Sequence, residues 1–200
     1  MIEVEKRFAL DNPEMEKKIL EGATFVAQEK HMDAYYDNDA YVLTTADRWL
    51  RTRDGQWELK EPLIPMAQRA PTFGSEYHEI TDTTELRSLL HLAKRGTLAE
   101  DIRRAGYHPL CTFTTNRDKY IRDGLTIVID IVSFGFRLAE VELMVHDASE
   151  SDAAHARIRA FIDTLGIPLK PVGGKMSEWF KRNNPAHYNT LQSLGVFSYR

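Results

Sequence analysis

The sequence predicts an α+β protein made mainly of antiparallel β-strands, closed into an eight-stranded, tunnel-like barrel with a polar interior and helices packed outside. Three stretches carry this prediction. The N-terminal stretch places Glu3, Glu5 and Arg7 at every second position, which is the period of a strand. A basic hairpin at 48–60 and an acidic strand at 136–145 repeat this alternation of charged and apolar positions.

Composition and charge narrow the class of protein. The 200 residues suit a single domain spanning 1–200, and 42% of them are hydrophobic, enough to bury a full core. A net charge of −4 argues against a general nucleic-acid or membrane surface. The single cysteine, Cys111, excludes an internal disulfide, and the sequence has neither a membrane-length apolar run nor a signal-peptide core. We therefore expect a cytoplasmic monomer that binds neither nucleic acid nor membrane.

Local signals set the elements that follow the first strand. The triplet Asp11-Asn12-Pro13 is typical of a helix start and predicts a short helix at 14–20. Residues 24–37 are expected to be extended, and residues 41–45 to form a second, shorter extended piece.

The basic hairpin turns at Asp54-Gly55, the dipeptide that most strongly indicates a two-residue turn between strands. The pairs that this turn aligns are Arg53 with Gln56, Arg51 with Glu58, and Trp49 with Lys60. They share one face, while the apolar side chains share the other. Three cations in line repel one another unless an anion lies among them.

Turns and caps outline the second half of the chain. Residues 62–72 contain three prolines and indicate a loop. A strand at 73–81 with Glu79 on its charged face precedes two helices, which together span 84–105.

A second hairpin, 109–121 with 125–133, turns at Asp123-Gly124 and places Arg117 across from Asp130. The acidic strand then carries Glu140 and Glu142 on one face. The expected remainder is a long helix at 147–166, helices beginning at Ser177 and Pro185, and a loose tail at 195–200.

The charged faces are expected to line the inside of the barrel. If the apolar faces pointed inward, the helices would have no apolar surface to cover. With the charged faces inward, one cavity collects a set of acids and a set of bases. The acids are Glu3, Glu5, Glu79, Asp130, Glu140 and Glu142, and the bases are Arg7, Arg51, Arg53, Lys60, Arg117 and Lys175. The alternative is a group of ordinary amphipathic strands whose charges lie in solvent.

A cavity with both sets of charges suits a metal–polyphosphate complex. Mg²⁺ prefers carboxylate oxygens and shares phosphate oxygens, and arginine forks bind phosphate through two hydrogen bonds. Histidine and cysteine are sparse, which disfavours zinc, and the sequence contains no P-loop and no Gly-rich dinucleotide loop.

These residues resemble a known family. Glu3-x-Glu5-x-Arg7 is similar to the ExExK signature of the CYTH superfamily, the triphosphate tunnel metalloenzymes. The resemblance continues in order through nearly the whole chain, at Arg51-x-Arg53, Glu58-Leu59-Lys60, Glu79, Arg117, Asp130, Glu140-x-Glu142 and Lys175. Within the superfamily, Tyr35-Tyr36-Asp37, Trp49-Leu50-Arg51, Trp57-Glu58-Leu59-Lys60 and Phe134-Gly135 resemble animal thiamine triphosphatases most closely.

The resemblance implies a Mg²⁺-dependent hydrolase, with Mn²⁺ as an alternative ion, that removes the terminal phosphate of thiamine triphosphate, inorganic tripolyphosphate or both. The implied catalytic cations are Arg7, Lys60, Arg117 and Lys175, which bind the phosphate chain together with Arg51 and Arg53. The implied metal ligands are Glu3, Glu5, Glu79, Asp130, Glu140 and Glu142. Trp49 would stack on the thiazolium ring, a cation–π contact, or would simply pack at the tunnel mouth.

Two other functions remain open at this stage: a class IV adenylyl cyclase-like enzyme acting on ATP, and a non-catalytic polyphosphate-binding module. The Trp49-Leu50-Arg51 match argues against the first, and the acids argue against the second. The chain also departs from the signature, because Arg7 replaces its lysine and cannot act as a neutral amine. Asp130 stands alone where some relatives carry a second aspartate, and Val128 occupies the position two residues earlier.

Overall fold

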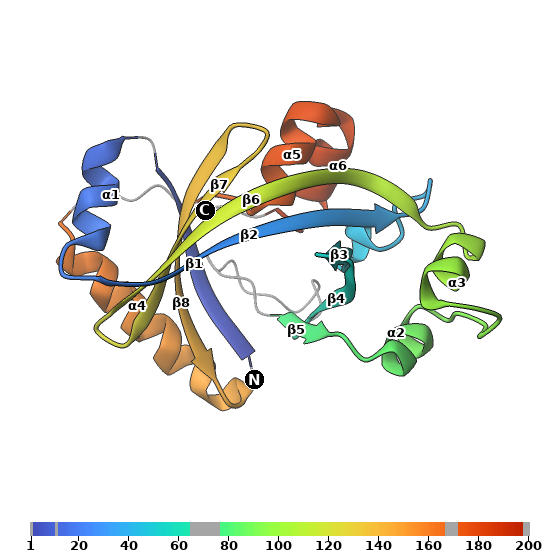
Figure 1. Cartoon of the computed structure of the whole chain (residues 1–200), viewed down its shortest axis with the longest axis horizontal. Helices are drawn as coiled ribbons and strands as arrows, with labels where there is room; N and C mark the ends of the chain where they lie inside the picture. The colour runs from blue at the N-terminus through green and yellow to red at the C-terminus, as the bar shows by residue number, and fades with distance from the viewer. Residues whose placement is uncertain (1, 11, 65–76, 167–171, 198–200) are drawn as a thin grey trace.

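The computed structural model describes residues 2–10, 12–64, 77–166 and 172–197. These residues form one sheet of eight strands with six α-helices around it (Figure 1). The strands are β1 (Ile2–Ala9), β2 (Thr24–Asp37), β3 (Trp49–Arg53), β4 (Gln56–Pro62), β5 (Tyr77–Ile80), β6 (His108–Arg122), β7 (Leu125–Val132) and β8 (Phe136–Val145). The helices are α1 (Pro13–Leu20), α2 (Thr83–Leu89), α3 (Leu98–Arg104), α4 (Ser151–Thr164), α5 (Lys175–Asn183) and α6 (Pro185–Ser193).

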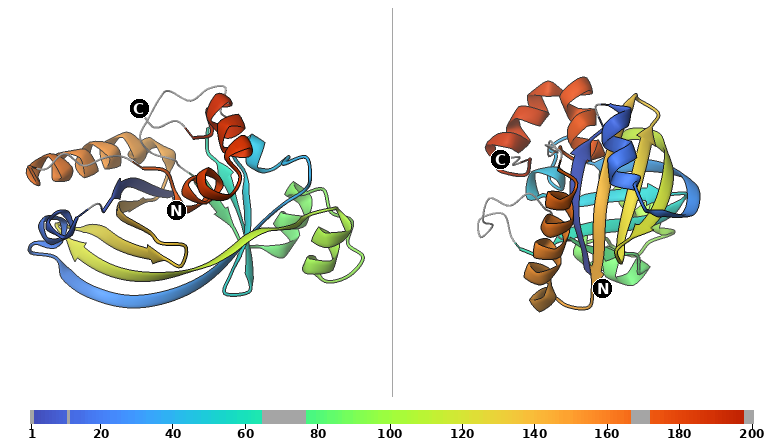
Figure 2. Two further views of the ribbon diagram at one scale, coloured as in Figure 1. Left: turned by 90° about the horizontal axis from the view of Figure 1, so that it is seen from above. Right: turned by 90° about the vertical axis from the view of Figure 1, so that its left-hand side faces the viewer.

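The sheet closes most of the way into a barrel. Its strands follow the order β1-β8-β7-β6-β2-β3-β4-β5, and each neighbouring pair is antiparallel. The long strands β2 and β6 curve strongly (Figure 2), which brings β5 toward β1 without a ladder between these two strands in the described part of the chain. The predicted antiparallel α+β barrel is confirmed, as a nearly closed one.

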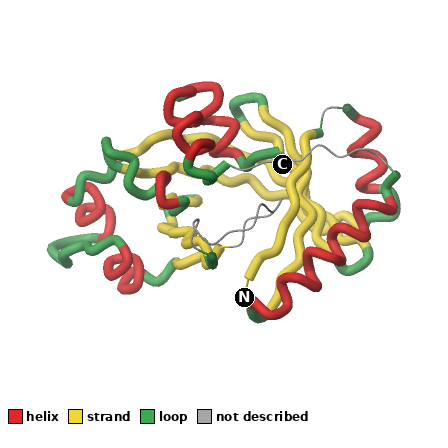
Figure 3. The backbone as a smooth tube through the Cα atoms, turned by 180° about the vertical axis from the view of Figure 1, so that it is seen from behind, coloured by secondary structure: helices red, strands yellow, loops and turns green. Residues whose placement is uncertain are grey.

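Helices α1 and α4 cover the outside of β1, β7 and β8. Val4 and Ile127, which are fully buried, pack in one cluster with Ile19 of α1 and Ile158 of α4. Because side chains alternate along a strand, burial of Val4 outside directs Glu3 and Glu5 inward. Figure 3 shows α4 lying along this side of the barrel, with α2 and α3 at the opposite end.

A second outer cluster joins the basic hairpin to α2 and α3. Leu50 of β3 and Leu59 of β4 are fully buried against Leu86 and Ile102. Thr97 begins α3 through a capping box, in which its side chain accepts from the Glu100 backbone N–H. This packing holds the apolar face of the hairpin outside and its cations inside.

Helices α5 and α6 pack differently, against the inner face of the barrel. Phe180 and Leu191 lie in a buried cluster with Tyr35 of β2, Phe113 of β6 and Leu138 of β8. These strand positions have the same parity as the charged positions, so the inner face is charged over one region and apolar over another. The alternation along the strands predicted helices outside the barrel and did not predict that α5 and α6 would pack on its inner face.

The turns of both hairpins match prediction. The ladders pair Arg51 with Glu58 in the first hairpin and Arg117 with Asp130 in the second. Each turn has an aspartate followed by a glycine at positive φ, the backbone conformation that such tight turns require.

The prediction of an extended piece at 41–45 is wrong. Tyr41 has a φ of 55° and is followed by the 3₁₀ turn η1 (Thr44–Ala46). The fully buried carboxylate of Asp37 accepts hydrogen bonds from the backbone N–H of Leu43 at 3.0 Å and of Thr44 at 2.8 Å. These bonds curl the segment around Asp37 and prevent it from running as a strand.

The helical predictions hold with shifted boundaries. Asn12 caps α1 by accepting from the Met15 N–H at 3.0 Å. The long helix at 147–166 consists of the 3₁₀ turn η3 (Ala148–Glu150) followed by α4, and α5 begins two residues before Ser177.

The predicted loose tail is wrong for Val196 and Phe197, which are 8% and 7% exposed and belong to the inner apolar cluster. Asp11, most of the predicted loop at 62–72 and the start of the predicted strand at 73–81 lie outside the described residues. Among the helices of the described chain, none combines the length and apolar character needed to span a bilayer.

Candidate active site in the barrel interior

Three buried carboxylates meet where β1 lies beside β8. Glu5, Glu140 and Glu142 are 5%, 4% and 7% exposed. Each offers an oxygen within 4.8 Å of the others, a spacing at which one cation could contact all three. The ladder explains this meeting, because it places Glu5 directly opposite Glu142 and Arg7 opposite Glu140. An all-oxygen donor set of this kind fits a hard divalent ion such as Mg²⁺.

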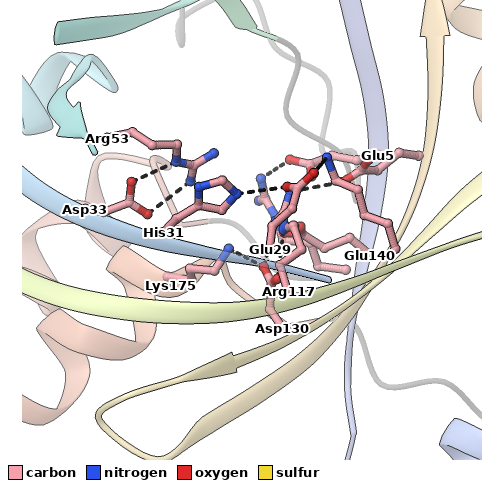
Figure 4. Close-up of polar contacts among 12 residues, drawn as sticks. Glu5, Glu29, His31, Asp33, Arg53, Arg117, Asp130, Glu140 and Lys175 are labelled. Atoms are coloured by element: carbon pink, nitrogen blue, oxygen red, sulfur yellow. Dashed lines mark hydrogen bonds and ion pairs between the residues drawn. The ribbon is translucent and has the colours of Figure 1, made fainter. Parts of the chain in front are cut away.

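Two arginines hold this carboxylate cluster. Arg7 pairs with Glu5 and donates from Nε to Glu140 Oε1 at 3.2 Å. Arg117 donates from Nη2 to Glu140 Oε2 at 2.7 Å and grips Asp130 with two bonds of 2.8 and 2.7 Å. Figure 4 shows Glu5, Glu140, Arg117 and Asp130 converging inside the barrel.

The two acids of β8 differ in their electrostatics. Burial alone would raise the pKa of Glu140, but the positive charges of Lys175, Arg117, Arg7 and Lys60 hold it well below its usual range. Burial raises the pKa of Glu142 to about 8, reinforced by the negative charges of Glu140 and Glu3. The pKa values of these two neighbouring acids are thus displaced in opposite directions, and a bound cation would favour the ionised form of Glu142.

A second charged group lies on the opposite wall, around the fully buried Asp33 of β2. Arg53 donates to both Asp33 oxygens, at 2.8 and 3.0 Å. Burial would raise the pKa of Asp33, but Arg53, Arg51 and Lys175 lower it overall. Arg51 forms an ion pair with Glu58, with 2.5 Å between Nη2 and Oε1. Its Nη1 donates a hydrogen bond to the hydroxyl of Tyr35 at 3.3 Å.

One donor of this second group lacks a protein acceptor. Arg51 is 4% exposed, yet its Nε has no hydrogen-bond partner among the described residues. A buried guanidinium N–H without an acceptor costs free energy, about 1–3 kcal/mol for a typical buried donor. An anionic ligand inside the barrel would satisfy it.

Lys175, the first residue of α5, connects the two groups. Its Nζ lies 2.5 Å from Asp130 Oδ2, and its charge acts on both Glu140 and Asp33. Gly174, the residue before this helix, lies beside Arg7, since a Cβ at this position would be in van der Waals contact with Arg7 Nη1 at 3.4 Å. The Lys175 ammonium is thus placed between the carboxylate cluster and the arginines of the hairpin (Figure 4).

The other expected acids are not part of the three-carboxylate cluster in the described residues. Lys60 pairs with Glu79, whose side chain is 42% exposed. Glu3 lines a cavity of about 300 Å³ together with Glu142, Lys119 and Thr126, beside the carboxylate cluster. Asp130 forms ion pairs with Arg117 and Lys175. In the described residues, the structure thus brings Glu5, Glu140 and Glu142 within reach of one cation, and Glu3, Glu79 and Asp130 are not in that group.

Trp49 lies on the inner face but is 7% exposed. Its Nε1 donates to Asp47 Oδ1 at 2.8 Å, and Tyr77 donates to the same oxygen at 2.9 Å. The ring of Phe197 stacks on the indole, with ring centroids 5.9 Å apart and planes 17° apart.

The sequence reasoning did not assign several charged residues of β2 to the interior. His31 lies between Asp54 Oδ2, 2.8 Å from its Nδ1, and Glu29 Oε2, 2.9 Å from its Nε2. Glu29 also pairs with Lys119 at 3.0 Å. The signal was present, because Glu29, His31 and Asp33 follow one another at the strand period, like Glu3, Glu5 and Arg7.

Known proteins resemble most of this chain. The CYTH domain family matches residues 1–170, which include both charged groups except Lys175. The chain belongs to the CYTH domain family. Human thiamine-triphosphatase is 30% identical over 96% of this CYTH chain and 89% of its own length, and the enzyme of Macaca fascicularis is 30% identical over the same shares.

Solved structures share the CYTH fold of this chain. The PH1819 protein of Pyrococcus horikoshii matches with a TM-score of 0.56 and 25% identity, over 84% of this chain and 92% of that one. A putative adenylate cyclase of Vibrio parahaemolyticus matches with a TM-score of 0.58 and 18% identity, over 90% and 98% of the two chains. The thiamine-triphosphatase relatives support chemistry on a triphosphate, and the solved structures support the fold.

Proposed function

We propose that this CYTH protein is a Mg²⁺-dependent hydrolase that removes the terminal phosphate of thiamine triphosphate, inorganic tripolyphosphate or both. The observation that carries the proposal is the juxtaposition of Glu5, Glu140 and Glu142 with buried arginines inside one barrel. A pure phosphate-binding site needs cations and has no use for a cluster of acids. An acid cluster beside cations suits a phosphate chain that carries a divalent ion.

In this proposal the acids bind the ion and the bases bind the phosphates. Glu5, Glu140 and Glu142 hold Mg²⁺, or Mn²⁺ in its place, with Glu3, Asp130 and Glu79 as further acids of the same site. When bound, the ion neutralises phosphate charge and lowers the pKa of a coordinated water. Arg51 and Arg53 bind the part of the chain that is not transferred, and the Nε of Arg51 gains its acceptor there.

The remaining cations act where charge develops. As water attacks the terminal phosphorus, the bond to the bridging oxygen breaks, and negative charge grows on the departing diphosphate and on the transferred group. Lys175, Arg117, Arg7 and Lys60 all act electrostatically on Glu140 and would stabilise that charge. Trp49, beside Lys60 in the ladder, would contact the organic group of a thiamine substrate.

A phosphate-release assay with thiamine triphosphate, tripolyphosphate and ATP, in Mg²⁺ and in excess chelator, tests this function. We expect release from one or both of the first two substrates, loss of activity in chelator and recovery on adding Mg²⁺. Full activity in chelator would contradict the assignment of a metal. Cyclic AMP formed from ATP would indicate a cyclase, and tight binding of tripolyphosphate without release would indicate a binding module.

A further inference from the structure

Three aromatic rings form a continuous stack at the α5–α6 end of the barrel. Phe197 stacks on Trp49, with centroids 5.9 Å apart, and Tyr188 of α6 stacks on Phe197, with centroids 5.7 Å apart. The planes differ by 17° and 30° respectively, so the rings lie nearly parallel. The segment that follows α6 therefore reaches back to the first residue of β3.

The indole that Phe197 covers is held firmly in place. Its N–H is bonded to Asp47, and its strand neighbour across the ladder is Lys60. Trp49 is 7% exposed and Phe197 is 7% exposed, so solvent reaches little of either ring. A planar ligand can stack on this indole only by replacing a neighbouring side chain, and the ring of Phe197 already lies parallel to it.

Substrates with and without a ring would meet this arrangement differently. Tripolyphosphate needs the arginines and the carboxylate cluster, whereas Phe197 packs on the aromatic rings of Trp49 and Tyr188. A substrate with an aromatic cation needs the position of the Phe197 ring as well. The conformation that can bind such a substrate is therefore the one in which the Phe197 ring has left Trp49. If only a fraction of the molecules adopts this conformation, the apparent affinity for the substrate is reduced by that fraction.

We propose that Phe197 is a specificity-determining residue, which occupies the stacking face of Trp49 and thereby disfavours triphosphates that carry an aromatic ring relative to inorganic tripolyphosphate. The inference rests on the proposed function, because it concerns the same site. It concerns a residue beyond 1–170, the segment matched by the CYTH family.

Two measurements on the full chain test it. In the first, kcat/KM is measured for thiamine triphosphate and tripolyphosphate on the same preparation of wild type, Phe197→Ala and Phe197→Leu. We expect the ratio of the two values to rise about three- to tenfold in favour of thiamine triphosphate, with the larger rise in Phe197→Ala. Because the fraction of folded protein cancels in the ratio, partial unfolding does not obscure the result.

Val196→Ala is the matched control. Val196 is buried in the same cluster and precedes Phe197, but its side chain has no ring to stack on Trp49. We expect its ratio to equal that of wild type. A rise as large as in the Phe197 variants would mean that any loosening of the segment suffices, and would overturn the role of the Phe197 ring.

The second measurement separates this inference from the proposed function. Calorimetric titration measures Kd for thiamine diphosphate, which carries the ring, and for pyrophosphate, which does not, without hydrolysis of a triphosphate. We expect Phe197→Ala to tighten the first about three- to tenfold and to change the second less than about twofold. Trp49→Ala combined with Phe197→Ala should abolish the gain.

Unchanged ratios and unchanged thiamine diphosphate affinity in both Phe197 variants would overturn the inference while leaving the proposed hydrolase intact. Absence of hydrolysis in wild type, with tighter thiamine diphosphate binding in Phe197→Ala, would overturn the hydrolase and retain the role of Phe197.

Discussion

Glu142→Gln tests the inward direction of the charged faces and the assignment of the carboxylate cluster together. The substitution keeps the side-chain volume and removes one charge that a bound cation would use. Burial and the charges of Glu140 and Glu3 raise the pKa of Glu142 from 4.5 to about 8, so the folded protein without metal holds a proton that the unfolded chain releases. Stability of the metal-free protein should therefore fall as pH rises between the two pKa values.

The size of this effect follows from proton linkage. One proton corresponds to about 1.4 kcal/mol per pH unit, so the group should cost about 2 kcal/mol of stability between about pH 6 and pH 8. For a chain of this length, that is a fall in Tm of about 4–8 °C. The substituted amide cannot titrate, so the variant should lose this part of the pH dependence. Thermal unfolding in chelator at the two pH values measures the difference.

The same substitution should lower the activity of the enzyme. Loss of one ligand charge in a buried site should lower kcat for phosphate release by about 10² or more, and Mg²⁺ should raise the Tm of the variant less than that of wild type. Wild-type turnover in Glu142→Gln would refute the inward assignment of this face.

Val141→Asp is the contrasting change on the same strand. Val141 is fully buried in the outer cluster with α1 and α4, so an aspartate there buries a charge without a partner. We expect a loss of several kcal/mol of stability and cooperative unfolding at a lower temperature. A well-folded Val141→Asp variant would place the apolar face elsewhere.

Three other substitutions examine the opposite wall. Trp49→Ala should lower kcat/KM for thiamine triphosphate about tenfold and leave tripolyphosphate nearly unchanged, and equal losses would limit Trp49 to supporting the hairpin. Arg51→Lys should raise KM for either substrate about tenfold, because lysine lacks the guanidinium fork, whereas an unchanged KM would remove Arg51 from the phosphate site. Asp33→Ala should cost about 3–5 kcal/mol at neutral pH by leaving Arg53 unpaired. Burial would raise the pKa of Asp33, but Arg53 and Arg51 lower it overall in the folded protein. The stability that the ionised Asp33 contributes is therefore present above the pKa of the unfolded chain and is lost in acid. Urea unfolding at low pH should therefore show a smaller difference between Asp33→Ala and wild type.

The period of the strands and the chemistry of the turns were sufficient to predict the barrel wall. Asp54-Gly55 and Asp123-Gly124 are local signals, and a two-residue turn fixes every pair that follows it along the hairpin. Side chains then alternate, so burial of Val4 outside is enough to send Glu5 and Arg7 inward. The inward faces of these strands could be predicted because neither step depends on distant parts of the chain.

Local patterns were less informative where one residue organises a distant segment. Residues 41–45 resemble a strand in composition, yet Asp37 accepts their backbone N–H groups and curls them into a turn. Asp33 is one acid within a long extended run, and its role is visible only where Arg53 and Arg51 converge on it from β3. Secondary-structure propensity depends on residues that are close in sequence, so it does not report hydrogen-bond or ion-pair partners that the fold brings together.

The sequence by itself determined the register of both hairpins and the face on which each charge lies, because turn geometry and side-chain alternation act over a few residues. The tertiary structure alone decided what fills each end of the interior. Phe113 and Leu138 have the same parity as the charged positions, and only the docking of α5 and α6 shows that they bind helices there. The same docking brings Lys175 between the charged groups and Phe197 onto Trp49. Apolar burial is non-directional, so a sequence indicates that these side chains will be buried but not against which surface.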